Sequence, residues 1–88
     1  MTKKEVIQKA HDTNELMLKK GGYIKGMGTG KFRLMTQDHS PIENIDGRVV
    51  ETMQDNGLLM LSNLVWVSSG VRKSVESIKD AANRARVS

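Results

Sequence analysis

The first 20 residues carry apolar side chains at the spacing of one face of an α-helix. The positions that share this face are Val6, Ile7, Ala10, Met17 and Leu18, and Asn14 interrupts them. An α-helix has about 3.6 residues per turn, so this pattern predicts a helix over residues 3–20. Thr2, with Glu5 three positions later, has the pattern of a capping box at its start, and Gly21 and Gly22 favour its end.

A β-hairpin is predicted to follow this helix. Residues 23–25 form a short strand, residues 26–30 a glycine-rich turn, and residues 31–36 a second strand. In the second strand Phe32 and Leu34 alternate with the polar Lys31 and Arg33, as expected when one face of a sheet is buried. Residues 38–41 (Asp-His-Ser-Pro) are rich in turn formers and indicate a loop after the hairpin.

The middle of the chain predicts a short helix and then a second hairpin. Residues 45–55 place Val49, Val50 and Met53 on one helical face, and Asn56 and Gly57 favour its end. Two apolar segments, residues 58–61 and 64–67, flank a Ser-Asn pair that has the place of a tight turn. Because both segments are apolar on both faces, we expect them to lie at the centre of the sheet.

A second amphipathic helix is predicted over residues 71–86, with Ser69 as a cap. Its apolar stripe consists of Val71, Val75, Ile78, Ala82 and Ala85. Two pairs at helical spacing, Arg72–Glu76 and Asp80–Arg84, would each add about 0.2–0.5 kcal/mol. The predicted order is therefore α-β-β-α-β-β-α, an α+β fold. We expect one small domain over residues 1–88, with an antiparallel sheet packed by the N- and C-terminal helices.

Composition excludes several classes of function. The chain has 88 residues and no cysteine, which excludes disulfides, thiol nucleophiles, cysteine zinc sites and iron–sulfur clusters. The longest apolar run, residues 58–61, is far shorter than the ~20 residues of a membrane-spanning helix. The first residues also lack the apolar core of a signal peptide. These features favour a cytoplasmic location, no membrane partner and no cofactor.

Three short motifs suggest chemistry that their context does not support. Residues 26–31 (Gly-Met-Gly-Thr-Gly-Lys) resemble a phosphate loop, but Phe32 replaces the metal-binding hydroxyl and a strand follows instead of a helix. Asp38, His39 and Ser40 are the residue types of a hydrolase triad, yet three consecutive side chains do not converge. His11 and Glu15 alone are too few ligands for a metal. We therefore expect no enzyme, catalytic residue, metal site or small-molecule substrate.

Charge is distributed unevenly along the chain and suggests nucleic-acid binding. Residues 1–33 carry eight basic and three acidic side chains, residues 34–60 one and five, and residues 61–88 five and two. Basic ends favour contacts with a phosphate backbone, which depend little on sequence. The first functional hypothesis is DNA binding through the terminal helices and the glycine-rich hairpin. The residues assigned to it are Lys3, Lys4, Lys9, Lys25, Lys31, Arg33, Arg72, Lys73, Lys79, Arg84 and Arg86.

The helix and hairpin of residues 49–67 resemble the recognition helix and wing of winged-helix domains. The resemblance covers about 20 residues and includes no diagnostic motif. It implies a helix inserted into the major groove. That helix carries Asp46, Glu51 and Asp55 against Arg48 alone, and DNA phosphates would repel this charge. The basic ends are therefore the better candidates for contact with DNA.

The alternative hypothesis is a protein-interaction module, either a small regulator or inhibitor or a subunit that forms a homo-oligomer. Its support is the alternating charge, the six methionines and the stripe of the last helix. Patches of opposite sign can pair between copies, and methionine adapts to irregular partner surfaces. The residues assigned to this surface are Met27, Met35, Val71, Val75 and Ile78.

Overall fold

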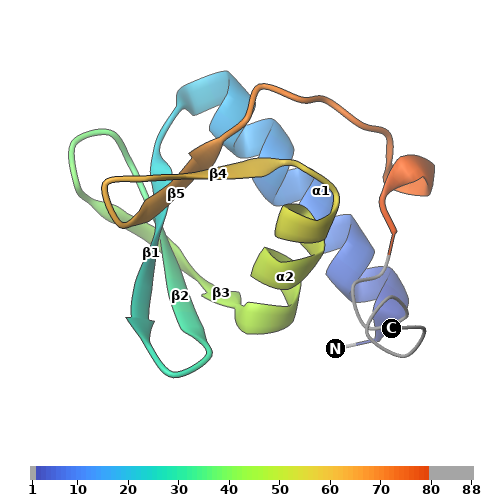
Figure 1. Cartoon of the computed structure of the whole chain (residues 1–88), viewed down its shortest axis with the longest axis horizontal. Helices are drawn as coiled ribbons and strands as arrows, with labels where there is room; N and C mark the ends of the chain where they lie inside the picture. Colours follow the sequence, from blue (N-terminus) through green and yellow to red (C-terminus); the bar gives the residue numbers. More distant parts are fainter. Residues whose placement is uncertain (1, 80–88) are drawn as a thin grey trace.

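A five-stranded antiparallel sheet and two helices form the computed structural model, which describes residues 2–79 (Figure 1). The fold class is α+β, as the sequence predicted. Along the chain the elements are α1 (Lys3–Lys20), β1 (Tyr23–Gly28), β2 (Lys31–Met35), β3 (Pro41–Asp46), α2 (Gly47–Asp55), β4 (Leu59–Ser62), β5 (Val65–Ser68) and the short 3₁₀ helix η1 (Val75–Ser77).

Local signals account for α1, which has the bounds that the sequence predicted. The Thr2 hydroxyl accepts a hydrogen bond from the Glu5 amide, and the Glu5 carboxylate accepts one from the Thr2 amide. The bond from the Thr2 backbone lowers the pKa of the Glu5 carboxyl because it favours the charged form. At the other end the Gly21 amide donates to the Met17 carbonyl, with Gly21 at a positive φ that glycine adopts without strain.

The strands lie in the order β3-β2-β1-β5-β4, so β3 and β4 form the two edges of the sheet. Ile24, Leu34 and Ile45 lie on one face of β1, β2 and β3 and are buried. They pack with Val6 and Ala10 of α1 and with apolar residues of α2. The register places Lys25 of β1 opposite Arg33 of β2. Strand side chains alternate between faces, so this pair lies on the opposite face.

The third strand was missing from the predicted order. Residues 41–44 were expected in a loop, and residues 45 and 46 at the start of a helix. Instead β3 pairs with β2 from Pro41 to Asp46. The Asp46 side chain then accepts from the Arg48 amide and begins α2 at Gly47. Proline and charged side chains hide the strand pattern here, because β3 lies at an edge where such residues are tolerated.

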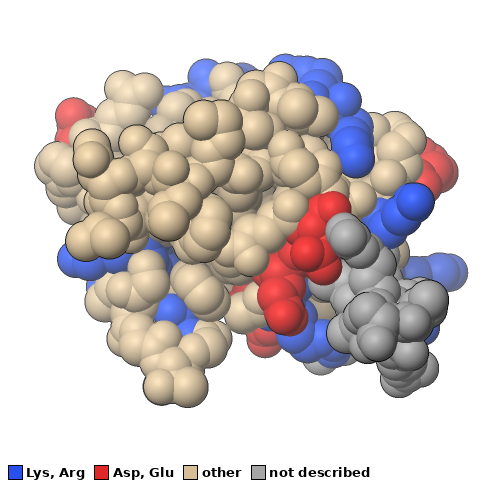
Figure 2. Space-filling view, in the orientation of Figure 1, with Lys and Arg blue, Asp and Glu red and all other residues tan. Residues whose placement is uncertain are grey.

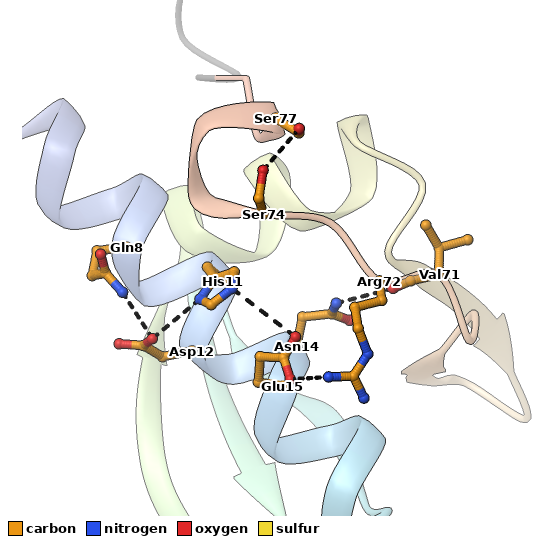
Figure 3. A network of polar contacts seen from close by, with 9 residues as sticks. All are labelled: Gln8, His11, Asp12, Asn14, Glu15, Val71, Arg72, Ser74 and Ser77. Atoms are coloured by element: carbon orange, nitrogen blue, oxygen red, sulfur yellow. Dashed lines mark hydrogen bonds and ion pairs between the residues drawn. The ribbon is translucent and has the colours of Figure 1, made fainter.

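The C-terminal helix predicted from residue 71 is wrong for residues 71–79, and residues 80–86 lie outside the described part. This segment runs across both helices instead (Figures 1 and 3). The Asn14 side chain of α1 donates to the Val71 carbonyl at 3.0 Å. Asn56 at the end of α2 donates to the Lys79 carbonyl and accepts from the Lys79 amide, both at 2.9 Å. The two asparagines thus form hydrogen bonds with backbone groups of Val71 and Lys79. In a helix these groups would bond to the backbone of the same segment.

A long-range contact replaces one of the two expected helical pairs, Arg72–Glu76, and the other pair, Asp80–Arg84, lies outside the described residues. The Arg72 guanidinium forms an ion pair with Glu15 of α1, not with Glu76 (Figure 3). Of the predicted stripe, Ile78 enters the core, Val75 is half-buried and Val71 is exposed. We call residues 70–79 the C-terminal strap. Packing of the sheet therefore comes from α1 and α2, which corrects the expected pair of terminal helices.

The second hairpin differs from its prediction in turn and position. Ser62 pairs with Val65, so Asn63 and Leu64 form the turn, one residue later than the predicted Ser-Asn turn. The hairpin was expected at the centre of the sheet, yet β4 is an edge strand. Apolar side chains on both faces of β4 therefore do not mean burial on both faces. They leave part of the strand exposed.

Candidate interaction surface

The three most exposed large apolar residues of the described chain lie on the β4–β5 hairpin. Met60 is 53% exposed, Leu61 59% and Leu64 89%. We call these three residues the hairpin patch. Figure 2 shows that the surface over β4 and the turn carries no Lys, Arg, Asp or Glu on this face, and that acidic side chains border it over α2. An apolar surface with a polar border is typical of a protein-interaction site.

The backbone of β4 has an outer edge available for pairing. The Ser69 amide donates to the Leu58 carbonyl, and Ser62 pairs with Val65 across the two-residue turn. Hydrogen-bonded pairs alternate in an antiparallel ladder, so Met60 also bonds to β5. The amides and carbonyls of Leu59 and Leu61 then point away from β5. Within residues 2–79 no strand lies on that side of β4.

Leu64 holds a strained backbone conformation at the tip of this hairpin. Asn63 and Leu64 have φ values of 50° and 68°, as in a type I′ turn. Asparagine tolerates this region well, but the second position favours glycine, and an ordinary side chain costs about 1–2 kcal/mol there. Leu64 gains little in return from packing, because the chain leaves almost all of it exposed. Strain of this kind is concentrated at functional sites.

Two of the described basic residues of the DNA hypothesis are paired with acidic side chains of the same chain. Lys9 of α1 contacts Glu43 of β3 at 2.8 Å, and Arg72 of the strap pairs with Glu15. Both cations therefore already have an acidic partner within the chain. Lys3 and Lys4 lie in the first turn of α1, and Lys73 and Lys79 in the strap. Arg84 and Arg86 lie outside the described residues.

Lys25 and Arg33 are two basic residues that the fold brings together. They are direct partners across β1 and β2, and Arg33 also donates to Asn44 of β3 at 3.2 Å. Like charges directly opposite one another destabilise a sheet. Among the described residues no carboxylate lies within ion-pair distance of either one. Lys31 lies farther along the hairpin, opposite Asp46 in the register.

The predicted partner-binding residues are dispersed. Met27 is 44% exposed near the tip of the β1–β2 hairpin, and Val71 is exposed in the strap. Met35 and Ile78 are buried. The hairpin patch was not among the predicted residues. Its signal in the sequence was a short strand, apolar on both faces, whose turn has leucine where glycine is favoured.

The three short motifs take structural roles. The predicted hairpin is present, but β1 continues to Gly28, so the turn before β2 consists of residues 29–30 and not of residues 26–30. Asp38, His39 and Ser40 form the β2–β3 loop, where the His39 ring lies 2.7 Å from the Tyr23 hydroxyl. His11 lies 4.0 Å from Glu15, which also binds Arg72 (Figure 3). Residues 2–79 contain no cluster of three metal-ligating side chains.

A shallow hollow lies beside Tyr23 and His39. It has a volume of about 480 Å³, and its lining includes Val65 and Val67 of β5 and Gln37 of the β2–β3 loop. None of its lining residues is acidic or basic apart from the histidine. The hollow thus offers few groups for chemistry, and it lies beside the same hairpin as the patch.

Comparison with protein-family models, curated proteins and solved structures finds no match. None of the helices formed by residues 2–79 has both the length and the apolar composition needed to cross a lipid bilayer.

Proposed function

We propose that the chain is a non-enzymatic protein-interaction module that binds its partner through the β4–β5 hairpin. The observation that carries this proposal is Leu64, which is 89% exposed and held at a φ of 68°. A leucine in this position lowers the stability of the isolated chain and exposes apolar surface to water. A partner that buries the side chain removes the cost of exposure, and the free energy of that burial offsets the backbone strain.

The neighbouring residues supply what such a contact needs. Met60 and Leu61 add apolar surface on the two opposite faces of β4, and methionine adapts its shape to a partner. The outward amides and carbonyls of Leu59 and Leu61 can bond to an added strand. Strand addition obtains affinity from these main-chain bonds and specificity from the alternate side chains.

Site-specific photo-crosslinking tests this proposal. A photoreactive amino acid replaces Leu64 in the full chain, within the cells that make the protein naturally. Thr29 is the matched control, since it lies exposed in the turn of the other hairpin. We expect defined protein adducts at position 64 and none of them at position 29. An absence of adducts at position 64, or the same adducts at both positions, would overturn the proposal.

A second candidate function, nucleic-acid binding, keeps support from the Lys25–Arg33 pair. Two cations directly opposite each other on neighbouring strands lower the stability of the sheet unless an anion lies between them. A phosphate backbone would supply that anion. The contact would be small, because Lys9 and Arg72 already have acidic partners within the chain.

Fluorescence anisotropy with a DNA duplex, measured against salt, tests this second candidate. Each phosphate contact contributes about 0.9 to the slope of log K against log salt, so Lys25→Gln with Arg33→Gln should reduce the slope by about 2. The control pair is Lys19→Gln with Lys20→Gln, at the exposed end of α1. No binding at low salt, or equal slopes in both double variants, would exclude the candidate.

A further inference from the structure

We propose that the partner of the hairpin is a second copy of this chain, and that the two β4 strands pair antiparallel about a two-fold axis beside Met60. The inference rests on the proposed function, because it names the partner of the same surface. The result would be a continuous ten-stranded sheet, built from the five strands of each copy.

The backbone of β4 is complementary to itself in this register. With Met60 on the axis, Leu59 of each copy lies opposite Leu61 of the other. These are the two residues whose amides and carbonyls point away from β5. The two Leu59–Leu61 pairs would exchange four hydrogen bonds, and Met60 of each copy would form the close, non-hydrogen-bonded pair between them.

The side chains of β4 permit this contact because the strand carries no charge. Leu59, Met60, Leu61 and Ser62 are all neutral, so two copies meet without like charges at the seam even though each chain has a net charge of +4. Met60 would pack against Met60 on one face of the sheet. Leu61, 59% exposed in the single chain, would pack beside the other copy's Leu59 on the second face.

The other edge of the sheet explains why assembly would stop at two copies. Pro41 of β3 has no amide to donate, the pairing of β2 with β3 is irregular next to it, and Glu43 turns its charge toward Lys9. These are features that prevent edge pairing. One open and one protected edge give a closed two-fold dimer instead of a fibre.

A disulfide across the axis tests the register directly. The chain has no cysteine, so Met60→Cys introduces the only thiol. Opposed residues in a non-hydrogen-bonded pair have Cα atoms about 4.5 Å apart, within the range of a disulfide. We expect oxidised dimers from Met60→Cys and none from Ile42→Cys, a control on the β3 edge that is 41% exposed. Crosslinking at position 42 but not at position 60 would overturn the inference.

Charge exchange at the same position provides a second test that does not depend on oxidation. Residue 60 of one copy would lie opposite residue 60 of the other, so a charged residue there would face a like charge. Met60→Lys and Met60→Glu should therefore each raise the dimer dissociation constant by about tenfold or more. An equimolar mixture of the two variants should restore the dimer. Circular dichroism confirms that each variant folds. A mixture that stays monomeric while both variants are folded would contradict the proposed axis.

Sedimentation of the full chain separates the failure of this inference from failure of the proposed function. A single β-strand contact is small, so we expect a monomer–dimer equilibrium between about 5 and about 500 μM. A strict monomer over that range overturns the second-copy inference. If position 64 then still forms adducts with a different protein, the proposed function stands with another partner. If it forms none, both proposals fail.

Discussion

The two edges of the sheet are built in opposite ways. β3 carries a proline, an irregular register and a carboxylate paired with Lys9 at 2.8 Å. β4 carries Leu-Met-Leu-Ser, with neither charge nor proline, and its turn presents an exposed leucine. An unprotected edge strand is a template for pairing with another chain. One edge thus guards against association, and the other is suited to it.

This contrast also separates two uses of apolar residues within one hairpin. Leu58, just before β4, is fully buried and joins the core with Leu59. Met60 and Leu61 keep more than half of their surface in water and Leu64 almost all of it, so these residues contribute less to the stability of the single chain than Leu58 does. The base of the hairpin serves the fold, and its outer part is left for a partner.

The largest expected effect comes from Leu58→Ala. Removing a fully buried leucine costs about 2–5 kcal/mol of unfolding free energy, because the lost contacts leave a cavity. The matched change Met60→Ala should cost only about 0.5 kcal/mol, since more than half of Met60 is already exposed to water. Chemical denaturation of both variants at low protein concentration measures the difference. Equal losses would mean that the outer part of the hairpin is not separate from the core.

Opening the protected edge should change assembly next. Pro41→Val combined with Glu43→Thr gives β3 the character of β4 and removes the Lys9 ion pair. We expect a loss of about 1 kcal/mol in stability and the appearance of species larger than a dimer. Light scattering over a concentration series detects them. If the variant forms species of the same size as the parent chain does, Pro41 and Glu43 are not what limits assembly.

Blocking the open edge is expected to have a smaller effect on stability. Leu61→Pro removes an amide that points away from β5, so the ladder with β5 is kept and the cost should be about 1 kcal/mol or less. Association through β4 should be lost. Thermal denaturation and sedimentation read out the two properties separately. A hairpin that unfolds in this variant would show that the Leu61 amide has a partner within the chain.

Leu64→Gly is expected to cause no loss of stability, and any change should have the opposite sign to that of the other variants. Glycine adopts positive φ freely, so the variant should be as stable as the parent or more stable by up to about 1 kcal/mol. Partner binding should nevertheless weaken. Calorimetry together with crosslinking at position 60 measures both quantities. A loss of stability would mean that Leu64 packs within the chain and is not available to a partner.

Part of the candidate site could be predicted from the sequence. The hairpin of β4 and β5, its apolar character and the presence of a tight turn were all predicted. Its exposure was not, because an apolar segment of four residues has the same pattern in the middle of a sheet and at its edge. The β1–β2 hairpin was predicted, but the pairing of Lys25 with Arg33 was not, because β1 continues to Gly28 and shortens the turn. The ion pairs of Lys9 and Arg72 join residues far apart in the chain.

The sequence by itself determined the elements whose signals are local. The capping box of Thr2 and Glu5 and the apolar spacing of α1 lie within one element, as do the alternation of β2 and its glycine-rich turn. Only the tertiary structure decided which strands are edges and what the C-terminal segment becomes. Asn14 holds the Val71 carbonyl across 57 positions, and Asn56 holds Lys79 across 23. Such bonds form only when the chain has folded. They replace the helical backbone hydrogen bonds that the apolar spacing of this segment predicted, because helix propensity is weaker than tertiary contacts.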